Sequence, residues 1–199
     1  MASSPNVTWQ PPRLSRVRRW EALDTCGATV WLTGLPASGK STLGAAVEER
    51  LVERGRFAYL LDGDNLRHGI CGDLGFSTAD RERNVLRVGE LAWLLADAGA
   101  VVVVALVSPF AGARDAVRNR HEQSRLPFFE VHVDTPLEVC IDRDPKGLYA
   151  LAQRGELPDF TGIGQPYEPP GQPELRVTGG MTVSAAADAV LGLLLTADS

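Results

Sequence analysis

Short apolar runs alternate along the chain with longer stretches in which apolar residues recur at helical spacing. Residues 29–33 form an apolar run that favours a strand and ends at Gly34, and residues 42–54 carry apolar side chains on one face of a predicted helix. The same order recurs at residues 57–61, a predicted strand, and at residues 80–98, a predicted helix. The pattern therefore predicts a repeated unit of strand, loop and helix.

The most apolar run, residues 101–107, has no polar position on either face. Such a run is typical of a strand inside a parallel sheet whose two faces are both covered by helices. We expect a further strand at 128–133, a short helix at 136–142, a short strand at 175–177 and a C-terminal helix at 184–195. The predicted fold class is α/β, with a three-layer, doubly wound parallel sheet.

The chain divides by composition into an N-terminal arm and one domain. Residues 1–27 are polar and arginine-bearing, and Pro11-Pro12 disfavours regular structure there, so we expect an arm that lies on the body or on a neighbouring subunit. Residues 28–199 are predicted to form a single domain. Within it, residues 155–173 hold five prolines and four glycines, which predicts a long loop, either a lid or an irregular connection.

Composition excludes several classes of function. The 199 residues carry a formal net charge of −5 and only 7% aromatic residues, which disfavours broad binding of nucleic acid or of an anionic membrane. The longest uncharged apolar stretch, residues 98–107, is far shorter than the roughly 20 residues that cross a bilayer. No secretory signal is recognisable, and Cys26, Cys71 and Cys140 form no CxxC pair, so we expect a cytoplasmic protein with reduced thiols.

The strongest motif is the segment 34–41, GLPASGKS, which matches GxxxxGK[ST] and lies between a predicted strand and a predicted helix. In that context glycines let backbone N–H groups turn toward phosphate oxygens, and the helix presents its positive N-terminus. Lys40 can then neutralise the β- and γ-phosphates, and the Ser41 hydroxyl can ligate Mg²⁺. The motif predicts a P-loop nucleoside triphosphate hydrolase or kinase, and by itself does not separate the two.

Carboxylates near the predicted sheet edge favour a kinase. The run 101–107 ends in Ser108 without an acid, whereas the strand 57–61 is followed by Asp62 and Asp64. If the extended backbone persists, the two carboxylates point to the same side, beside the phosphates. A carboxylate there can hold Mg²⁺ through water or accept a proton from an attacking hydroxyl, and both roles suit a small-molecule kinase.

The connection after these carboxylates is polar and rich in glycine. Arg67 and Arg81 favour an anionic acceptor, because guanidinium groups pair with phosphate or sulfate oxygens, although surface ion pairs are an equal alternative. His68 is more often structural than a base in such a loop. Phe76 and Phe160 lie in loops with little apolar company, where each could stack on a purine or pack on the core.

Taken together, these segments resemble the adenylylsulfate kinases (adenosine 5′-phosphosulfate kinases) of sulfate assimilation. The similarity covers most of residues 29–176. Beyond the phosphate loop, it rests on LDGDNLRHG at 61–69, GDLGFS at 72–77, Asp80-Arg81, VGE at 88–90, SPF at 108–110, VDTPLEVC at 133–140, RDPKGLY at 143–149, DFTGI at 159–163 and YEPP at 167–170.

The resemblance implies transfer of the γ-phosphoryl group of ATP to the 3′-hydroxyl of adenosine 5′-phosphosulfate, with Mg²⁺. It implies a homodimer, no nucleic-acid or membrane partner, and functional coupling to an ATP sulfurylase. By this resemblance, Asp64 is the base or the group that orients the attacking hydroxyl, Lys40 and Asp62 complete the catalytic set, and Ser41 holds Mg²⁺ with Asp62 through water. ATP would be bound by Gly34, Leu35, Pro36, Ala37, Ser38, Gly39, Lys40, Ser41, Thr42 and Arg143. The acceptor would be bound by Asp64, Arg67, Phe76, Arg81, Asn84, Ser108, Lys146, Leu148 and Phe160, under a lid at about 155–173.

Two mechanistic questions stay open at this point. Ser108 could carry a covalent phosphoryl group, but no histidine or lysine is placed to activate it, so direct in-line transfer is preferred. The chain also departs from the family pattern at Arg83, Ala111, Ala150 and Leu151, where we expect altered affinity rather than lost chemistry. The alternatives are a regulatory module that binds phosphosulfate nucleotides, and a P-loop kinase for another small-molecule hydroxyl.

Overall fold

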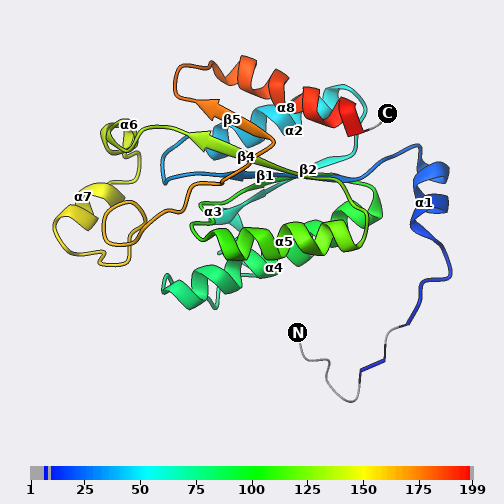
Figure 1. Cartoon of the computed structure of the whole chain (residues 1–199), viewed down its shortest axis with the longest axis horizontal. Helices are drawn as coiled ribbons and strands as arrows, with labels where there is room; N and C mark the ends of the chain where they lie inside the picture. Colours follow the sequence, from blue (N-terminus) through cyan, green and yellow to red (C-terminus); the bar gives the residue numbers. More distant parts are fainter. Residues whose placement is uncertain (1–6, 9, 198–199) are drawn as a thin grey trace.

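Five parallel strands form the centre of the molecule in the computed structural model, which describes residues 7–8 and 10–197. The strand order across the sheet is β2-β3-β1-β4-β5 (Figure 1). The strands are β1 Ala28–Thr33, β2 Ala58–Asp62, β3 Val101–Ala105, β4 Phe128–Asp134 and β5 Leu175–Thr178. Every strand expected from the apolar runs is present, and no strand end differs from its expected position by more than two residues.

Helices cover both faces of this sheet (Figure 1). On one face α2 (Lys40–Glu53) and α8 (Val183–Ala197) enclose an apolar core with the strands, and on the other face α4 (Thr78–Ala98) and α5 (Ala111–Gln123) enclose a second. The remaining helices are α1 Arg16–Leu23, α3 Gly63–Leu66, α6 Leu137–Arg143 and α7 Leu148–Gln153. The three-layer, doubly wound α/β architecture predicted from the sequence is confirmed.

Burial on both faces explains the composition of the central strands. Val30 on β1 lies between Val103 on β3 and Phe129 on β4, and all six residues of β1 and all five of β3 are buried. A strand between two helical layers has no solvent-facing side, so it favours continuous apolar residues over alternation. In the described part of the chain, no helix is long and apolar enough to cross a membrane.

The N-terminal arm contains regular structure that the sequence argument missed. Helix α1 begins after Ser15, whose side chain accepts a hydrogen bond from the Arg18 N–H, so the helix lies beyond the two prolines. Trp20 Nε1 donates to Asp97 O (3.0 Å) and Arg19 pairs with the Asp97 carboxylate (3.0 Å) at the end of α4. Helix α1 therefore lies on the body, at the end opposite α6 and α7 (Figure 1). Residues 1–6 and 9 of the arm lie outside the described residues.

Helix α5 was also missed, because most of its residues are polar. It buries Ala113 and Val117 together with Arg114 and His121, and the last two are satisfied by hydrogen bonds rather than by apolar contact. Such a helix shows little apolar periodicity in the sequence. Residues 155–173, by contrast, form the expected loop, with neither helix nor strand apart from an isolated bridge between Thr161 and Gln165.

The close packing of α4 on α5 depends on Gly89. A Cβ at this position would lie 2.4 Å from Val117 Cγ2, whereas a Cβ at Gly192 on α8 would have no neighbour within 4 Å. We expect Gly89→Ala to lower the free energy of unfolding by about 1–3 kcal/mol through overpacking. The matched variant Gly192→Ala should raise it by up to about 1 kcal/mol through helix propensity alone. Chemical denaturation measures both, and equal effects at the two positions would contradict this packing argument.

Candidate active site

A cavity of about 1040 Å³ opens at the carboxyl ends of the strands. Its walls come from the loop after β1, from α3, from the start of α4, from the segment after β3, from the turn between α6 and α7, and from the loop 155–173. Among the residues singled out in the sequence, its lining includes Pro36, Ala37, Ser38, Gly39, Lys40, Ser41, Thr42, Asp62, Asp64, Arg67, Phe76, Arg81, Asn84, Ser108, Arg143, Lys146, Leu148 and Phe160.

The loop between β1 and α2 is wound around the Lys40 ammonium. Gly39 has a φ of 104° and Ala37 a φ of 60°, so the backbone turns through left-handed conformations just before α2. Lys40 Nζ donates to Gly34 O (3.0 Å) and Leu35 O (2.6 Å). Burial lowers the pKa of Lys40 to about 8, because desolvation disfavours the charged form. The ammonium is thus preorganised inside the loop.

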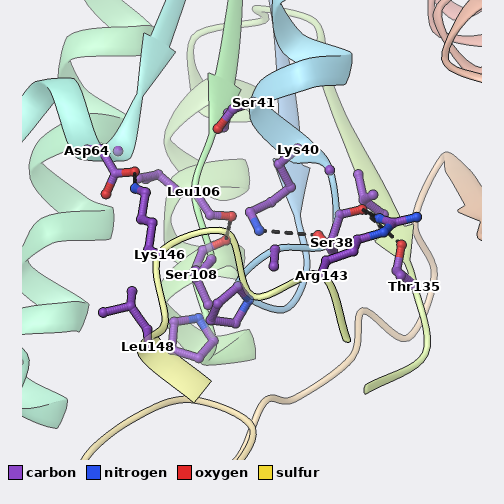
Figure 2. Close-up of a pocket in the computed structure, with 18 of the residues that line it drawn as sticks. Ser38, Lys40, Ser41, Asp64, Leu106, Ser108, Thr135, Arg143, Lys146 and Leu148 are labelled. Carbon is purple, nitrogen blue, oxygen red and sulfur yellow. Dashed lines mark hydrogen bonds and ion pairs between the residues drawn. The ribbon is translucent and has the colours of Figure 1, made fainter. Parts of the chain in front are cut away.

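Three side chains brace this loop from outside. Thr135 Oγ1 donates to Ser38 O (2.9 Å), Arg143 Nη1 donates to the same carbonyl (3.4 Å), and Tyr149 OH donates to Pro36 O (3.0 Å). Figure 2 shows Thr135 and Arg143 converging on Ser38. Thr135 and Tyr149 were quoted in the sequence only as parts of longer matching segments, because a bracing contact between distant residues leaves no local pattern.

The two carboxylates at the end of β2 both line the cavity, but they have different partners. Asp62 caps α3, accepting the Asp64 N–H at Oδ1 (2.9 Å), and its Oδ2 accepts from the Ser41 hydroxyl (2.6 Å). Asp64 already belongs to the helix, so the extended backbone on which the expectation depended does not persist. Asp64 instead pairs with Lys146 across the cavity (Figure 2). Both side chains of this pair are more than half exposed, so little free energy opposes its separation.

Arg67, Phe76 and Arg81 form one cluster at the start of α4. The Arg67 guanidinium lies 4.3 Å from the centroid of the Phe76 ring, and Arg81 donates to Phe76 O (3.0 Å) and to Asp159 O (2.9 Å) in the loop 155–173. Burial lowers the pKa of Arg81 through desolvation, and the nearby Arg67 charge adds to this. Two partly desolvated guanidinium groups beside an exposed ring can bind an aromatic anion.

Phe160 differs from its expected environment. It is 9% exposed and contacts Tyr149 edge to face, with ring centroids 4.9 Å apart, in an apolar cluster that includes Cys140 and Ala152. The expectation of little apolar company is therefore wrong for Phe160, because α6 and α7 fold beneath the loop. Its ring still lines the cavity, whereas His68 is exposed and is not part of the described lining.

Asn84 and Ser108 are two buried polar residues of the cavity lining, and they differ in whether their side-chain oxygen is hydrogen-bonded. Asn84 is 6% exposed and its buried Oδ1 has no hydrogen-bond partner among the described residues. The Ser108 hydroxyl accepts from Trp31 Nε1 (3.1 Å) and donates to Thr33 Oγ1 (2.9 Å). Ser108 also has a φ of 40°, a left-handed conformation that costs free energy in a residue other than glycine.

Comparisons with known proteins point to one family. A family model described as adenylylsulphate kinase matches residues 26–178. The chain is 49% identical over 189 residues to an adenylyl-sulfate kinase of Enterobacter sp. (strain 638), covering 95% of this chain and 93% of that protein. It is 47% identical over 190 residues to an adenylyl-sulfate kinase of Aeromonas salmonicida, covering 95% and 96%.

Comparison with solved structures points to the same family. The APS kinase of Mycobacterium tuberculosis, determined in complex with AMPPNP and APS, superimposes with a TM-score of 0.83 at 50% identity, covering 85% of this chain and 98% of that chain. A gluconokinase of Sinorhizobium meliloti superimposes with a TM-score of 0.56 at 17% identity, covering 88% and 99%. At that identity the second similarity shows the fold alone.

Because Lys40 has a pKa of about 8 in the free protein, nucleotide affinity should depend on pH. Phosphate oxygens favour the charged lysine, and above pH 8 the free protein holds it neutral, so binding must take up a proton. The dissociation constant of a nucleoside triphosphate should rise about tenfold per pH unit above 8. Terminal phosphates are fully ionised there, since their last pKa is about 6. Isothermal titration between pH 7 and 9.5 measures this.

Lys40→Gln is the matched control, since it keeps a polar side chain that does not titrate. Its weaker nucleotide binding should be flat over the same range. A pH-independent affinity in the unsubstituted protein would show that burial does not lower the Lys40 pKa.

Proposed function

The chain belongs to the adenylylsulfate kinase family, and we propose that it transfers the γ-phosphoryl group of ATP to the 3′-hydroxyl of adenosine 5′-phosphosulfate. One observation carries the proposal: the phosphate loop with Lys40, the carboxylate of Asp64 and the cluster of Arg67, Phe76 and Arg81 line a single cavity. A donor phosphate, a group that accepts a proton and an anion-binding aromatic cluster are the parts that such a transfer requires.

The nucleotide half of the cavity would hold ATP at the phosphate loop. The backbone N–H groups at the start of α2 and the Lys40 ammonium would bind the β- and γ-phosphates. Arg143, already in contact with Ser38 O (3.4 Å), would lie along the bound nucleotide. Lys40 would then exchange its carbonyl partners for phosphate oxygens, and its charge would stabilise the charge that develops on the leaving group.

Mg²⁺ fits the oxygen donors at this point of the site. The Ser41 hydroxyl and the Asp62 carboxylate lie 2.6 Å apart, and Mg²⁺ favours a few protein oxygens together with substrate phosphates and water. No group of three or more His, Cys, Asp and Glu side chains among the described residues could form an all-protein cage. Ser41 would hold the ion, with Asp62 through water, and the ion would neutralise charge on the transferred phosphoryl group.

The acceptor half would hold adenosine 5′-phosphosulfate at the start of α4. Arg67 and Arg81 would bind the phosphosulfate, and Asn84 would contribute its free Oδ1 and amide. The adenine would stack between Phe76, which is 58% exposed, and the cavity face of Phe160. Leu148 would complete the apolar wall. The loop 155–173 would act as the lid that excludes water.

Transfer would proceed directly between the two substrates. The 3′-hydroxyl oxygen would attack the γ-phosphorus while the bond to the bridging β–γ oxygen breaks, and the hydroxyl proton would pass to Asp64. Lys146, paired with Asp64 in this structure, would turn toward the phosphates as the hydroxyl enters. Ser108 would position rather than react, because its hydroxyl is already hydrogen-bonded to Trp31 and Thr33.

The alternatives have less support. A regulatory module that binds without turnover could dispense with Lys40 or Asp64, and the chain keeps both. The four departures from the family pattern, at Arg83, Ala111, Ala150 and Leu151, lie outside the described cavity lining. A kinase for another hydroxyl is favoured only by structures such as the gluconokinase, whose similarity is that of the fold.

The setting of the enzyme in the cell also belongs to this proposal. The family resemblance implies a homodimer. An APS kinase of Thiobacillus denitrificans with 32% identity is described as hexameric, which supports assembly from more than one chain rather than a dimer in particular. The location would be the cytoplasm, and the substrate would be supplied by an ATP sulfurylase, the class of reaction that makes adenosine 5′-phosphosulfate.

The decisive test is ATP-dependent formation of 3′-phosphoadenosine 5′-phosphosulfate by the purified chain. Asp64→Ala should lower turnover by about 10²–10⁴-fold, as expected for loss of a group that takes up a proton in the transition state. Turnover should also vanish without Mg²⁺. The control is Asp142→Ala, which removes an exposed carboxylate of α6 outside the described lining. Binding of the acceptor without turnover would instead favour the regulatory module.

Ser108→Ala distinguishes direct transfer from a covalent intermediate. Direct transfer predicts turnover within about tenfold of the unsubstituted enzyme, since only positioning is disturbed. Stability should fall by about 1–3 kcal/mol, because the buried Trp31 N–H loses its acceptor. Steady-state rates and thermal unfolding measure the two effects. A loss of turnover as large as that of Asp64→Ala would support a phosphoserine.

A further inference from the structure

Glu168 joins the C-terminal end of the loop 155–173 to the wall of the cavity. Its N–H donates to Pro109 O (2.8 Å), its carbonyl accepts from Arg114 Nη2 (2.8 Å), and its carboxylate accepts from the Ala111 N–H (2.7 Å). Three hydrogen bonds thus connect one exposed loop residue to the segment that follows β3. Glu168 itself lies outside the described lining of the cavity.

The segment that Glu168 contacts is firmly held. Arg114 is 2% exposed and donates from Nε to Glu130 Oε1 on β4 (2.6 Å) and from Nη1 to Ser108 O (2.7 Å). Ser108 and Pro109 both line the cavity. The loop end is therefore fixed to a rigid part of the acceptor wall rather than to another mobile segment.

The carboxylate contact has a specific electrostatic role. Ala111 is the first residue of α5, and the residue before it, Phe110, provides no side-chain cap. The first N–H groups of a helix have no intrahelical partner and carry partial positive charge. The Glu168 carboxylate supplies both the missing acceptor and a negative charge, so docking of the loop end and capping of α5 are the same interaction.

The middle of the loop is held at the nucleotide side. Tyr149 on α7 donates to Pro36 O in the phosphate loop and contacts Phe160 edge to face. Leu157, Pro158, Asp159 and Phe160, in this middle part, line the cavity. Freeing the Glu168 end would remove one of the contacts that keep this part over the site, beside those of Phe160 with Tyr149 and of Asp159 O with Arg81.

From these contacts we infer that Glu168 is a positioning residue for phosphoryl transfer, whose carboxylate fixes the lid to the start of α5 and so keeps water from the nucleotide. The inference rests on the proposed function and extends it to a residue that touches neither substrate. Without the contact, water can replace the acceptor hydroxyl as nucleophile, and ATP and water then give ADP and phosphate.

The test compares the products of one reaction mixture. For the unsubstituted enzyme, ADP and 3′-phosphoadenosine 5′-phosphosulfate should form in equal amounts. Glu168→Ala should raise ATP hydrolysis relative to transfer, and the KM for the acceptor, by about tenfold, the size expected for loss of one helix cap. Glu168→Gln should recover most of the coupling, since an amide oxygen can still accept from the Ala111 N–H.

Ala111→Pro removes the other half of the contact without harming the helix. Proline is favoured at the first helical position, and Phe110, with φ −102° and ψ 128°, already has the extended backbone that must precede it. We expect the same uncoupling as in Glu168→Ala, with no fall in melting temperature. The double variant should be no worse than either single variant, because both remove one interaction.

Limited digestion supplies a readout that needs no turnover. Arg154, exposed at the start of the loop, should be cut by trypsin about tenfold faster in Glu168→Ala and Ala111→Pro, both with a nonhydrolysable ATP analogue bound. Asp97→Asn, which alters an ion pair at the opposite end of the molecule, should change neither cleavage nor coupling.

The inference is overturned if both variants keep normal coupling and cleavage, or if they only lose stability. Absence of product from the unsubstituted enzyme would overturn the proposed function, while faster cleavage in the variants would still support the lid contact.

Discussion

Parallel pairing of β1 between β3 and β4 is the constraint on which the site depends. Because all five strands run in one direction, the segments that follow β1, β2, β3 and β4 must emerge at the same edge of the sheet. The phosphate loop, Asp62, the Ser108 segment and the bracing Thr135 are brought together by this geometry, although they are spread over a hundred residues of sequence. The helices on both faces stabilise this strand pairing through two apolar cores. The same cores therefore fix the positions of the segments that form the cavity walls.

A chain with a net charge of −5 can bind two anions only by local arrangement of its cations. Lys40 is buried and held by carbonyls, and Arg67 and Arg81 are held by Phe76, Leu74 and Asp159 before any ligand enters. Fixing these side chains in advance reduces the entropy lost on binding, and burial strengthens their attraction for phosphate. The same burial lowers the Lys40 pKa, because loss of hydration disfavours the charged ammonium until an anion binds beside it.

How much the sequence could predict depended on whether the information was local. Residues 101–107 and 34–41 each carry their own pattern, so strand β3 and the phosphate loop were predicted within a few residues. Helix α5 escaped because Arg114 and His121 are buried through hydrogen bonds with β4 and with its own backbone, which no apolar period reveals. Phe160 was placed among little apolar company because its contact with Tyr149 exists only after α7 folds under the loop. The extended backbone expected from Asp62 to Asp64 is replaced by the first residues of α3, which Asp62 caps, although both carboxylates still line the cavity.

Contacts between distant residues, rather than local structure, also hold the loop 155–173 in place. A segment with five prolines and four glycines in residues 155–173 cannot fix itself by repeated backbone hydrogen bonds, so its position must come from contacts with the rest of the chain. Tyr149, through Phe160, ties the middle of the lid to the loop that would hold the donor phosphates, and Glu168 ties its C-terminal end to the wall that would face the acceptor. The lid therefore contacts both the nucleotide half and the acceptor half of the cavity. A buried cation holds the backbone of each half: Lys40 donates to Leu35 O on the nucleotide side, and Arg114 donates to Ser108 O on the acceptor side. A lid held in this way must release Phe160 and Asp159 to open over the site, while the Glu168 contact keeps its C-terminal end in register.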